Sequence, residues 1–307
     1  MRSAVFGLLT TMLFVPAPAQ AWGFEAHKFI VARAIDMLPE QLRPFFEANR
    51  AFIVERSIDP DLWRNAGFTE EPPNHFLDFD AYGSYPFKDL PREYDAALKK
   101  YGIDKLRQNG LVPWRTQEIA GRLIRGFEAL RANGPYAQSD VRFFSAIIGH
   151  YVADAHVPLH AVVNYNGQLT GQSGIHNRWE DDLFIRYQQQ LAIKPPPVRS
   201  ISNERDFIFD TLLESAQLAG DVLAADKKAI GNRDTYDDQY FETLFRETRP
   251  ILEKRLNDAI SGVASIITSA WEQAGKPTLT ANPPARTPQR RRTTQGAAPD
   301  NPRWTYM

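Results

Sequence analysis

The chain of 307 residues contains no cysteine. It therefore forms no disulfide, offers no thiolate to a metal ion, and has no cysteine to which a lipid anchor could be attached. It also lacks a strong charge of either sign, because its formal net charge is −1. This balance gives no overall attraction to nucleic acid or to anionic lipid, and it disfavours a protein that wraps DNA. It does not disfavour a compact active site.

Near the N-terminus, the apolar run over residues 4–15 is too short to cross a bilayer, for which about 20 residues are needed. Arg2 precedes this run, and the small residues Ala19 and Ala21 follow it in an Ala-x-Ala pattern. These features are typical of a secretory signal peptide over residues 1–21, and a membrane anchor is the disfavoured alternative. We expect a secreted or periplasmic protein whose mature chain begins at Trp22.

No sustained alternation of apolar and polar residues indicates a sheet, whereas apolar residues recur at helical spacing through most of the chain. The sequence predicts an all-α fold with one helical domain over residues 22–275. The proline- and arginine-rich residues 276–307 are predicted to be a disordered tail. Two loops, 58–80 and 164–174, are expected to be irregular. The predicted helices are 24–38, 116–132, 139–155, 176–190, 204–225 and 235–274, the last interrupted at Pro250.

Five of the six histidines stand at spacings typical of metal ligands, with carboxylates placed to match. His150 and Asp154 are one helical turn apart, and so are His176 and Glu180, which puts each pair on one helix face. Nitrogen and oxygen ligands suit a catalytic zinc ion, although manganese or another divalent ion fits the same set. The candidate side-chain ligands are His27, Asp61, His75, His150, Asp154, His160, His176 and Glu180.

Each part of this pattern has a simpler alternative. His150 and Asp154 alone could be a buried histidine–carboxylate hydrogen bond. A second pair of the same spacing, with His160 between the two, favours metal binding instead. His156 stands two residues after Asp154 and points to another side of the helix, so we expect it to be a surface or supporting residue rather than a ligand.

The arrangement resembles the superfamily that joins zinc-dependent phospholipases C with the single-strand-specific zinc nucleases of fungi and plants, over about residues 22–180. The resemblance implies a helical fold that holds three zinc ions in one cleft. Trp22 would bind through its free amino group and carbonyl oxygen, and Asp154 would bridge two ions. Asp59 competes with Asp61, but only Asp61 has the family's Asp-x-x-Arg order, with Arg64. The implied sets are Asp61, His75, His150 and Asp154; His160, His176 and Glu180; and Trp22, His27 and Asp154.

The implied activity is hydrolysis of a phosphodiester by a zinc-activated water. Asp61 and Asp154 would hold the catalytic ions, and Arg64 would neutralise charge on the phosphoryl group. The alternative for Arg64 is a surface ion pair with Glu70 or Glu71. A non-catalytic zinc-binding helical protein is a further alternative, disfavoured because the ligand sets leave open coordination positions.

The substrate is either a single-stranded nucleic acid or a phospholipid headgroup. The short spacing from Trp22 to His27 and the Asp61–Arg64 order resemble the nucleases. Phe76 and Asp78 resemble residues that stack on a base and read its edge in that branch, although Phe76 also fits an ordinary core position. Glu180 resembles the phospholipases instead, and the disulfides of the nucleases are absent. The sequence favours the nuclease narrowly, with phospholipase C as the alternative.

Overall fold

The computed structural model describes residues 23–281, and this range contains helices and loops but no β-strand. The predicted all-α fold is therefore confirmed. The expected signal peptide, Trp22 and residues 282–307 lie outside the described residues. The longer α-helices are α1 (Phe24–Asp36), α7 (Val112–Arg131), α8 (Ala137–Ala155), α11 (Glu204–Ile230) and α12 (Asp238–Gln273).

Shorter helices connect these long ones. The short α-helices are α2 (Arg43–Ala48), α3 (Arg50–Arg56), α4 (Asp59–Asn65), α5 (Tyr94–Tyr101), α6 (Ile103–Asn109), α9 (Ile175–Asn177) and α10 (Leu183–Tyr187). The 3-10 helices are η1 (Pro72–His75), η2 (Phe79–Tyr82), η3 (Pro158–Ala161) and η5 (Gln188–Gln190), and η4 (Arg178–Asp182) is a π-helix.

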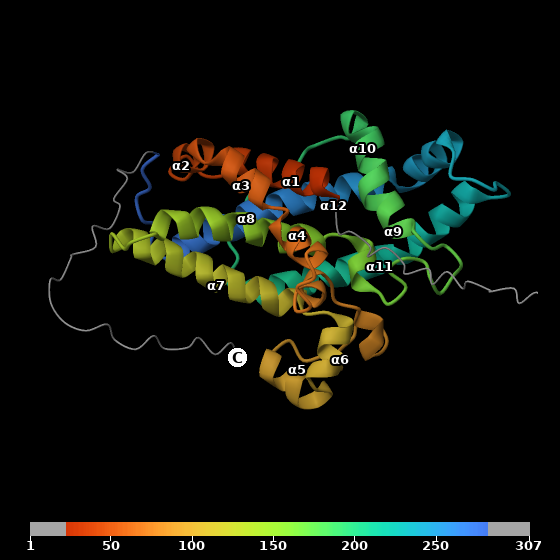
Figure 1. Ribbon diagram of the computed structural model, residues 1–307, viewed down its shortest axis with the longest axis horizontal. Coiled ribbons are helices and arrows are strands. Elements are labelled where there is room, and N and C mark those ends of the chain that lie inside the picture. Colours follow the sequence, from red (N-terminus) through yellow and green to blue (C-terminus); the bar gives the residue numbers. More distant parts are fainter. Residues whose placement is uncertain (1–22, 282–307) are drawn as a thin grey trace, which may run out of the picture.

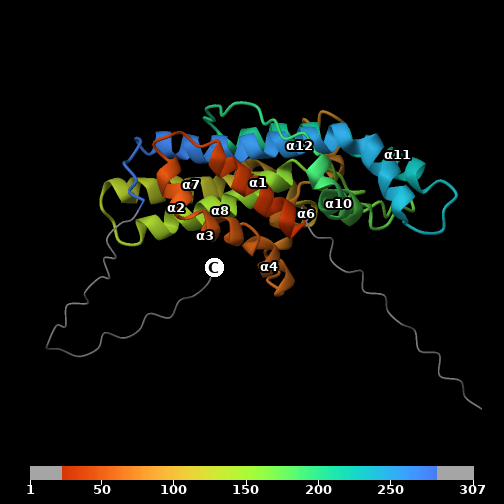
Figure 2. The same ribbon diagram turned by 90° about the horizontal axis from the view of Figure 1, so that it is seen from above.

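Helix α8 forms the centre of the bundle. It packs against α7, α12, α1 and α3, and its residues from 145 to 155 are all buried. Figure 1 shows α7 and α8 running side by side, and Figure 2 shows α12 extending along one side of the bundle. A helix that is apolar around its whole circumference belongs in such a position. Polar side chains on α8 are consequently held inside the protein.

Pro250 does not interrupt the last long helix, so this prediction was wrong. Helix α12 continues from Asp238 to Gln273 with Pro250 inside it. An internal proline removes one backbone hydrogen bond and costs about 3 kcal/mol. The packing of α12 against α11, α1, α7 and α8 offsets that cost. The carboxylate of Asp237 also fixes the start of the helix by accepting a hydrogen bond from the Tyr240 amide at 2.8 Å.

One further prediction needs correction. The segment 58–80 is not wholly irregular, because α4 begins at Asp59 with Pro60 in its first turn, where proline is well tolerated. The segment 176–190 is helical throughout, as predicted, but its helix type changes along α9, η4, α10 and η5. π-Helical turns of this kind often occur at functional sites. The loop 164–174 contains only turns and bends, as expected.

The segment with α5 and α6 lies beside the bundle rather than within it (Figure 1). Helix α6 contacts η1, and the Asn109 carbonyl oxygen accepts a hydrogen bond from the Asp78 amide at 2.8 Å. This lobe therefore supports the segment that follows His75. Among residues 23–281, no helix has both the length and the apolar character needed to cross a membrane.

Candidate metal centre

Eight buried side chains converge beside α8, and each is at most 5% exposed. They are the eight side chains that the sequence marks as candidate ligands, although seven different helical elements carry them. The ninth expected ligand, Trp22, lies outside the described residues. The eight are His27 of α1, Asp61 of α4, His75 of η1, His150 and Asp154 of α8, His160 of η3, His176 of α9 and Glu180 of η4.

The ligand atoms form three groups, and within each group all atoms lie within 4.8 Å of one another. His150 belongs to two of the groups, so these two form one larger cluster. His27 groups with Asp61, whereas the family resemblance places it with Trp22 and Asp154. The groups are His27, Asp61 and His150; His75, His150 and Asp154; and His160, His176 and Glu180.

Asp154 occupies the middle of the cluster. Its Oδ1 lies 3.3 Å from His27 Nε2, and its Oδ2 lies 3.0 Å from His75 Nδ1 and 3.2 Å from His150 Nε2. The two carboxylate oxygens thus face different histidines, which is the geometry that a bridging ligand requires. Burial alone would raise the pKa of Asp154, but His150, His27 and His75 outweigh burial and hold the pKa well below its usual value.

Backbone carbonyl groups orient two of the histidines. His150 Nδ1 donates to the Ser57 carbonyl oxygen at 2.8 Å, and His160 Nδ1 donates to the His75 carbonyl oxygen at 2.8 Å. Each bond fixes the proton on Nδ1 and leaves the Nε2 lone pair free for a metal ion. Such bonds to the second ring nitrogen commonly set the orientation of metal-binding histidines.

The third group combines neutral imidazoles with a buried carboxylate. His176 Nε2 lies 3.0 Å from Glu180 Oε2, and His160 Nε2 lies 3.7 Å from the same oxygen. Burial lowers the pKa of His160 to about 4, and it holds the pKa of His176 well below the usual value. Burial, and then the charges of Asp154 and Asp61, hold the pKa of Glu180 well above its usual value.

These donors fit a divalent cation. Asp61, Asp154 and Glu180 are three fully buried carboxylates, and Asp61 Oδ2 and Glu180 Oε1 form no hydrogen bond within residues 23–281. Burying several carboxylates together is costly unless cations or hydrogen bonds compensate for their charge. Imidazole nitrogens and carboxylate oxygens that converge in this way are the ligand set of zinc sites.

Arg64 lies at the same cluster, and the alternative of a surface ion pair was wrong. Its Nη2 lies 2.9 Å from Asp61 Oδ1, and its side chain is 9% exposed. Glu70 instead pairs with Arg107, at 2.5 Å. The Arg64 charge also contributes to the lowered pKa values of both His160 and His176.

The neighbouring Asp59 differs from Asp61 in that it pairs with an arginine outside the metal groups. Its Oδ2 lies 3.3 Å from Arg56 Nη1 on the preceding helix, and it belongs to none of the three groups. The choice of Asp61 over Asp59 from the Asp-x-x-Arg order therefore agrees with the geometry. One helical turn separates Asp61 from Arg64, which explains why that order brings them together.

Glu71 is a functional candidate that the sequence reasoning missed. Its Oε1 lies 3.5 Å from His75 Nε2, on the side of the ring opposite Asp154, and it accepts a hydrogen bond from the Tyr151 hydroxyl at 2.5 Å. The Tyr151 hydroxyl in turn accepts from Arg115 Nε at 3.3 Å. The signal was present, because Glu71 and His75 are four residues apart like the ligand pairs.

A second overlooked group anchors the segment that carries His176 and Glu180. Arg178 Nη2 lies 3.0 Å from Asp226 Oδ1 of α11, and Arg178 Nε donates to the Tyr240 hydroxyl of α12 at 2.8 Å. Asp226 also accepts from Gln172 Nε2 at 2.7 Å. Arg178 is 6% and Asp226 is 1% exposed. No local spacing could reveal this pair, because 48 residues separate its members.

The two predicted base-binding residues lie at the η1–η2 connection. Phe76 is half-buried, and its carbonyl oxygen accepts a hydrogen bond from the Val112 amide at 3.2 Å. Asp78 is 7% exposed and belongs to none of the metal groups. Burial, together with the charge of Asp80, raises the pKa of Asp78 to about 8. The assignment of Phe76 and Asp78 to base binding stays a prediction.

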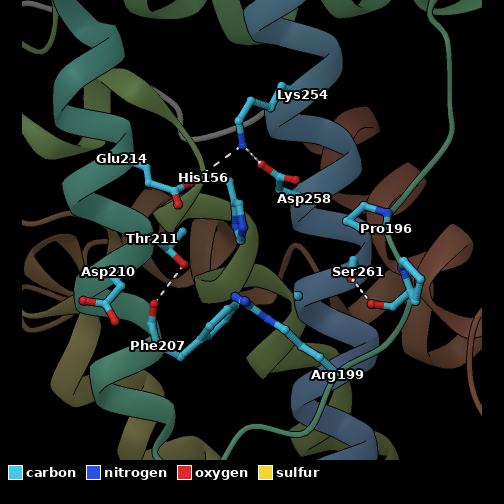
Figure 3. A pocket seen from close by; sticks show the side chains of 12 residues that line it. His156, Pro196, Arg199, Phe207, Asp210, Thr211, Glu214, Lys254, Asp258 and Ser261 are labelled. Atoms are coloured by element: carbon cyan, nitrogen blue, oxygen red, sulfur yellow. Dashed lines mark hydrogen bonds and ion pairs between the residues drawn. The ribbon is translucent and has the colours of Figure 1, made fainter.

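His156 is also outside the metal groups, as expected, but it is not on the surface. Its side chain is buried, with 3% exposed, and its Nδ1 donates to the Val152 carbonyl oxygen at 2.7 Å. The ring lines a separate cavity, which Figure 3 shows.

No protein-family model matches the sequence, and no curated protein does. Two similar solved structures are an alpha-toxin of Clostridium perfringens from an avian strain and the alpha toxin of Clostridium absonum. The first has 17% identity and a TM-score of 0.49 over 85% of this chain. The second has 14% identity and a TM-score of 0.45 over 83% of this chain. The chain spans 65% of the length of each. This distant similarity assigns neither a family nor an activity.

Proposed function

We propose that the protein is an exported, zinc-dependent hydrolase of phosphodiesters. The observation that carries the proposal is the convergence of eight buried imidazole and carboxylate side chains, with one carboxylate facing two sets of histidines. Structural zinc sites are closed by four ligands, whereas each of these groups supplies three side chains. When bound, zinc lowers the pKa of water towards neutrality and neutralises charge on phosphate oxygens.

The side chains around the cluster hold the ligands in place. His27, His75, His150, Asp154 and Asp61 would hold two ions with the terminal Trp22, and the third group would hold one more. Ser57, Glu71 and the His75 carbonyl fix the imidazole rings. Preorganised ligands of this kind reduce the rearrangement needed during reaction.

Arg64 is the side chain that we propose binds the phosphate group, in addition to the zinc ions. Its guanidinium is paired with Asp61, and its charge contributes to the lowered pKa values of His160 and His176. A guanidinium in this position donates to phosphoryl oxygens and stabilises the negative charge that develops on them. Asp61 holds the Arg64 side chain in that orientation.

For the substrate we favour a phospholipid headgroup. Of the nuclease-like features, the Asp78 carboxyl group is buried and has a raised pKa, which disfavours a charged contact with a base edge. Glu180, the phospholipase-like residue, lies in the third group with His160 and His176. Single-stranded nucleic acid is the second candidate. It is favoured by the contact between Asp61 and Arg64, because the order of these two residues resembles that of the nucleases.

The decisive experiment uses zinc-loaded protein that begins at Trp22. Phosphocholine release from phosphatidylcholine vesicles and cleavage of single-stranded DNA are measured in parallel, with and without a chelator. Asp154→Asn is expected to abolish hydrolysis and release zinc, because Asp154 contacts three histidines, while helix content is retained. The control Asp95→Asn alters an exposed carboxylate on α5 and is expected to leave activity unchanged.

Each result has a clear meaning. Chelator-sensitive release of phosphocholine supports the proposal, whereas cleavage of DNA alone supports the nuclease. Zinc binding without either activity would contradict phosphodiester hydrolysis and support the non-catalytic alternative. Full activity of the Asp154→Asn variant would show that the Asp154 carboxylate is not needed for hydrolysis.

A further inference from the structure

A cavity of about 200 Å³ lies between α11, α12 and the end of α8 (Figure 3). None of its lining residues belongs to the metal groups. Pro196, Pro197 and Phe207 form apolar walls, while charged side chains of α11 and α12 surround the remainder. Drug-sized ligands occupy cavities of about 300–1,000 Å³, so this one suits a smaller molecule.

His156 offers a hydrogen-bond acceptor to this cavity. Its Nδ1–H donates to the Val152 carbonyl oxygen, which leaves the lone pair on Nε2. The ring is 3% exposed, and in Figure 3 it lies among the lining side chains of α11 and α12. Arg255 fixes the backbone here by donating from Nε to the His156 carbonyl oxygen at 2.9 Å. A Cβ at Gly262 would lie 3.2 Å from His156 Cε1, so glycine gives the ring its room.

A second wall is fixed by a stripe of polar side chains on α12. The extended segment 194–201 runs along this helix, and side chains spaced four residues apart bind its backbone. Asn257 and Ser265 accept from the amides of Lys194 and Arg199, at 2.6 and 3.0 Å. Ser261 donates to the Pro197 carbonyl oxygen, and Ser269 accepts from the Ile201 amide. The backbone that carries Arg199 is therefore held in place.

The guanidinium of Arg199 points into the cavity (Figure 3) and lies 5.1 Å from the centre of the Phe207 ring. Within residues 23–281 it has no ion-pair partner. The three carboxylates of the cavity each have another cation: Asp210 pairs with Arg92, Glu214 with Arg255 and Asp258 with Lys254. Of the two cationic side chains that line the cavity, Lys254 is paired with Asp258, whereas the exposed Arg199 is left without a carboxylate partner in the described part of the chain. His156 Nε2 remains as a free acceptor.

A matching ligand needs an anionic oxygen for Arg199 and a hydrogen-bond donor for His156. A carboxylate or a sulfate provides only the first, whereas a monoprotonated phosphate provides both on one small group. We propose that this cavity binds the monoanion of a phosphate group, with Arg199 donating to its oxygens and the P–OH donating to His156 Nε2. The phosphate is either free or the end of a small phosphomonoester. This site lies apart from the metal groups and does not depend on the activity proposed for them.

The test follows the histidine ring by NMR in zinc-loaded protein labelled with nitrogen-15 in histidine. The His156 signals are assigned with a His156→Gln variant. Inorganic phosphate, glycerol phosphate and sulfate are titrated separately. We expect a saturable shift of His156 Nε2 with phosphate and an affinity for sulfate about tenfold or more lower, because sulfate lacks the hydroxyl donor. Tighter binding of glycerol phosphate identifies an ester as the ligand, and tighter binding of inorganic phosphate identifies the free anion.

Matched arginine variants complete the test. Arg199→Gln is expected to weaken phosphate binding at His156 about tenfold or more. The control variant is Arg186→Gln, because Arg186 also lies over an aromatic ring but is outside the cavity. This variant should leave phosphate binding at His156 unchanged. The proposal is overturned if His156 shows no saturable shift, if sulfate binds as well as phosphate, or if Arg199→Gln has no effect. Phosphate bound only at the metal centre would shift the other histidines and would also overturn it.

Discussion

Replacing Asp226 with asparagine removes the carboxylate that faces the buried guanidinium of Arg178. The two groups lie 3.0 Å apart, and Arg178 belongs to the same short segment as His176 and Glu180. Removing one member of a buried ion pair typically costs about 3–5 kcal/mol, because the remaining charge is left uncompensated. Asparagine keeps one oxygen that can accept a hydrogen bond. We therefore expect the free energy of unfolding to fall by an amount near the lower end of this range.

The variant should also weaken metal binding in a specific way. Asp226 anchors the segment of the third group to α11, whereas the groups around His150 are held by α1, α4, η1 and α8. Loss of a supporting contact of this kind typically lowers metal affinity by about 10–100-fold. We therefore expect Asp226→Asn to lose the ion of the third group at limiting zinc and to keep the others.

Urea unfolding in saturating zinc and metal content at limiting zinc measure the two effects. Asp238→Asn is the matched control, because Asp238 also lies 3.0 Å from an arginine, Arg186, but is 89% exposed. Exposed pairs contribute about 0–1 kcal/mol. The double variant Arg178→Met with Asp226→Asn removes the uncompensated charge, so it should recover stability while zinc affinity stays low. The reasoning is refuted if Asp226→Asn behaves like Asp238→Asn, or if the double variant restores zinc binding.

Three other predictions follow from single groups. Glu71→Gln should lower the affinity of the His75 site for zinc by about 10–100-fold, measured by competition with a chelator, and an unchanged affinity would show that Glu71 does not orient His75. Asp78→Asn should raise the melting temperature more at pH 8 than at pH 4. The folded protein keeps the Asp78 proton up to a pKa of about 8, whereas the unfolded chain loses it near pH 3.8, so stability falls with rising pH in this window. Equal effects at both pH values would contradict the raised pKa. Retaining one residue ahead of Trp22 should reduce zinc content, because the terminal amine becomes an amide, and unchanged zinc content and activity would exclude Trp22 as a ligand.

The sequence determined the all-α fold and the identity of the clustered side chains. His150 and Asp154 are four residues apart on an apolar helix, and helix geometry alone then places their side chains on one face inside the bundle. The same spacing marks His176 and Glu180, whose side chains meet at 3.0 Å even though part of that segment is a π-helix. Local geometry over one turn decides these contacts, so they can be predicted without the rest of the fold.

Tertiary packing alone decided which side chains from distant parts of the sequence face each other. The meeting of His75 with Asp154 joins residues 79 positions apart, and that of Arg178 with Asp226 joins residues 48 apart. Such contacts depend on how whole helices pack, which no local spacing encodes. Packing also keeps α12 continuous through Pro250 and buries the side chain of Asp78. It likewise brings Arg199 to the cavity of His156, because the stripe on α12 fixes a segment that has no regular structure of its own.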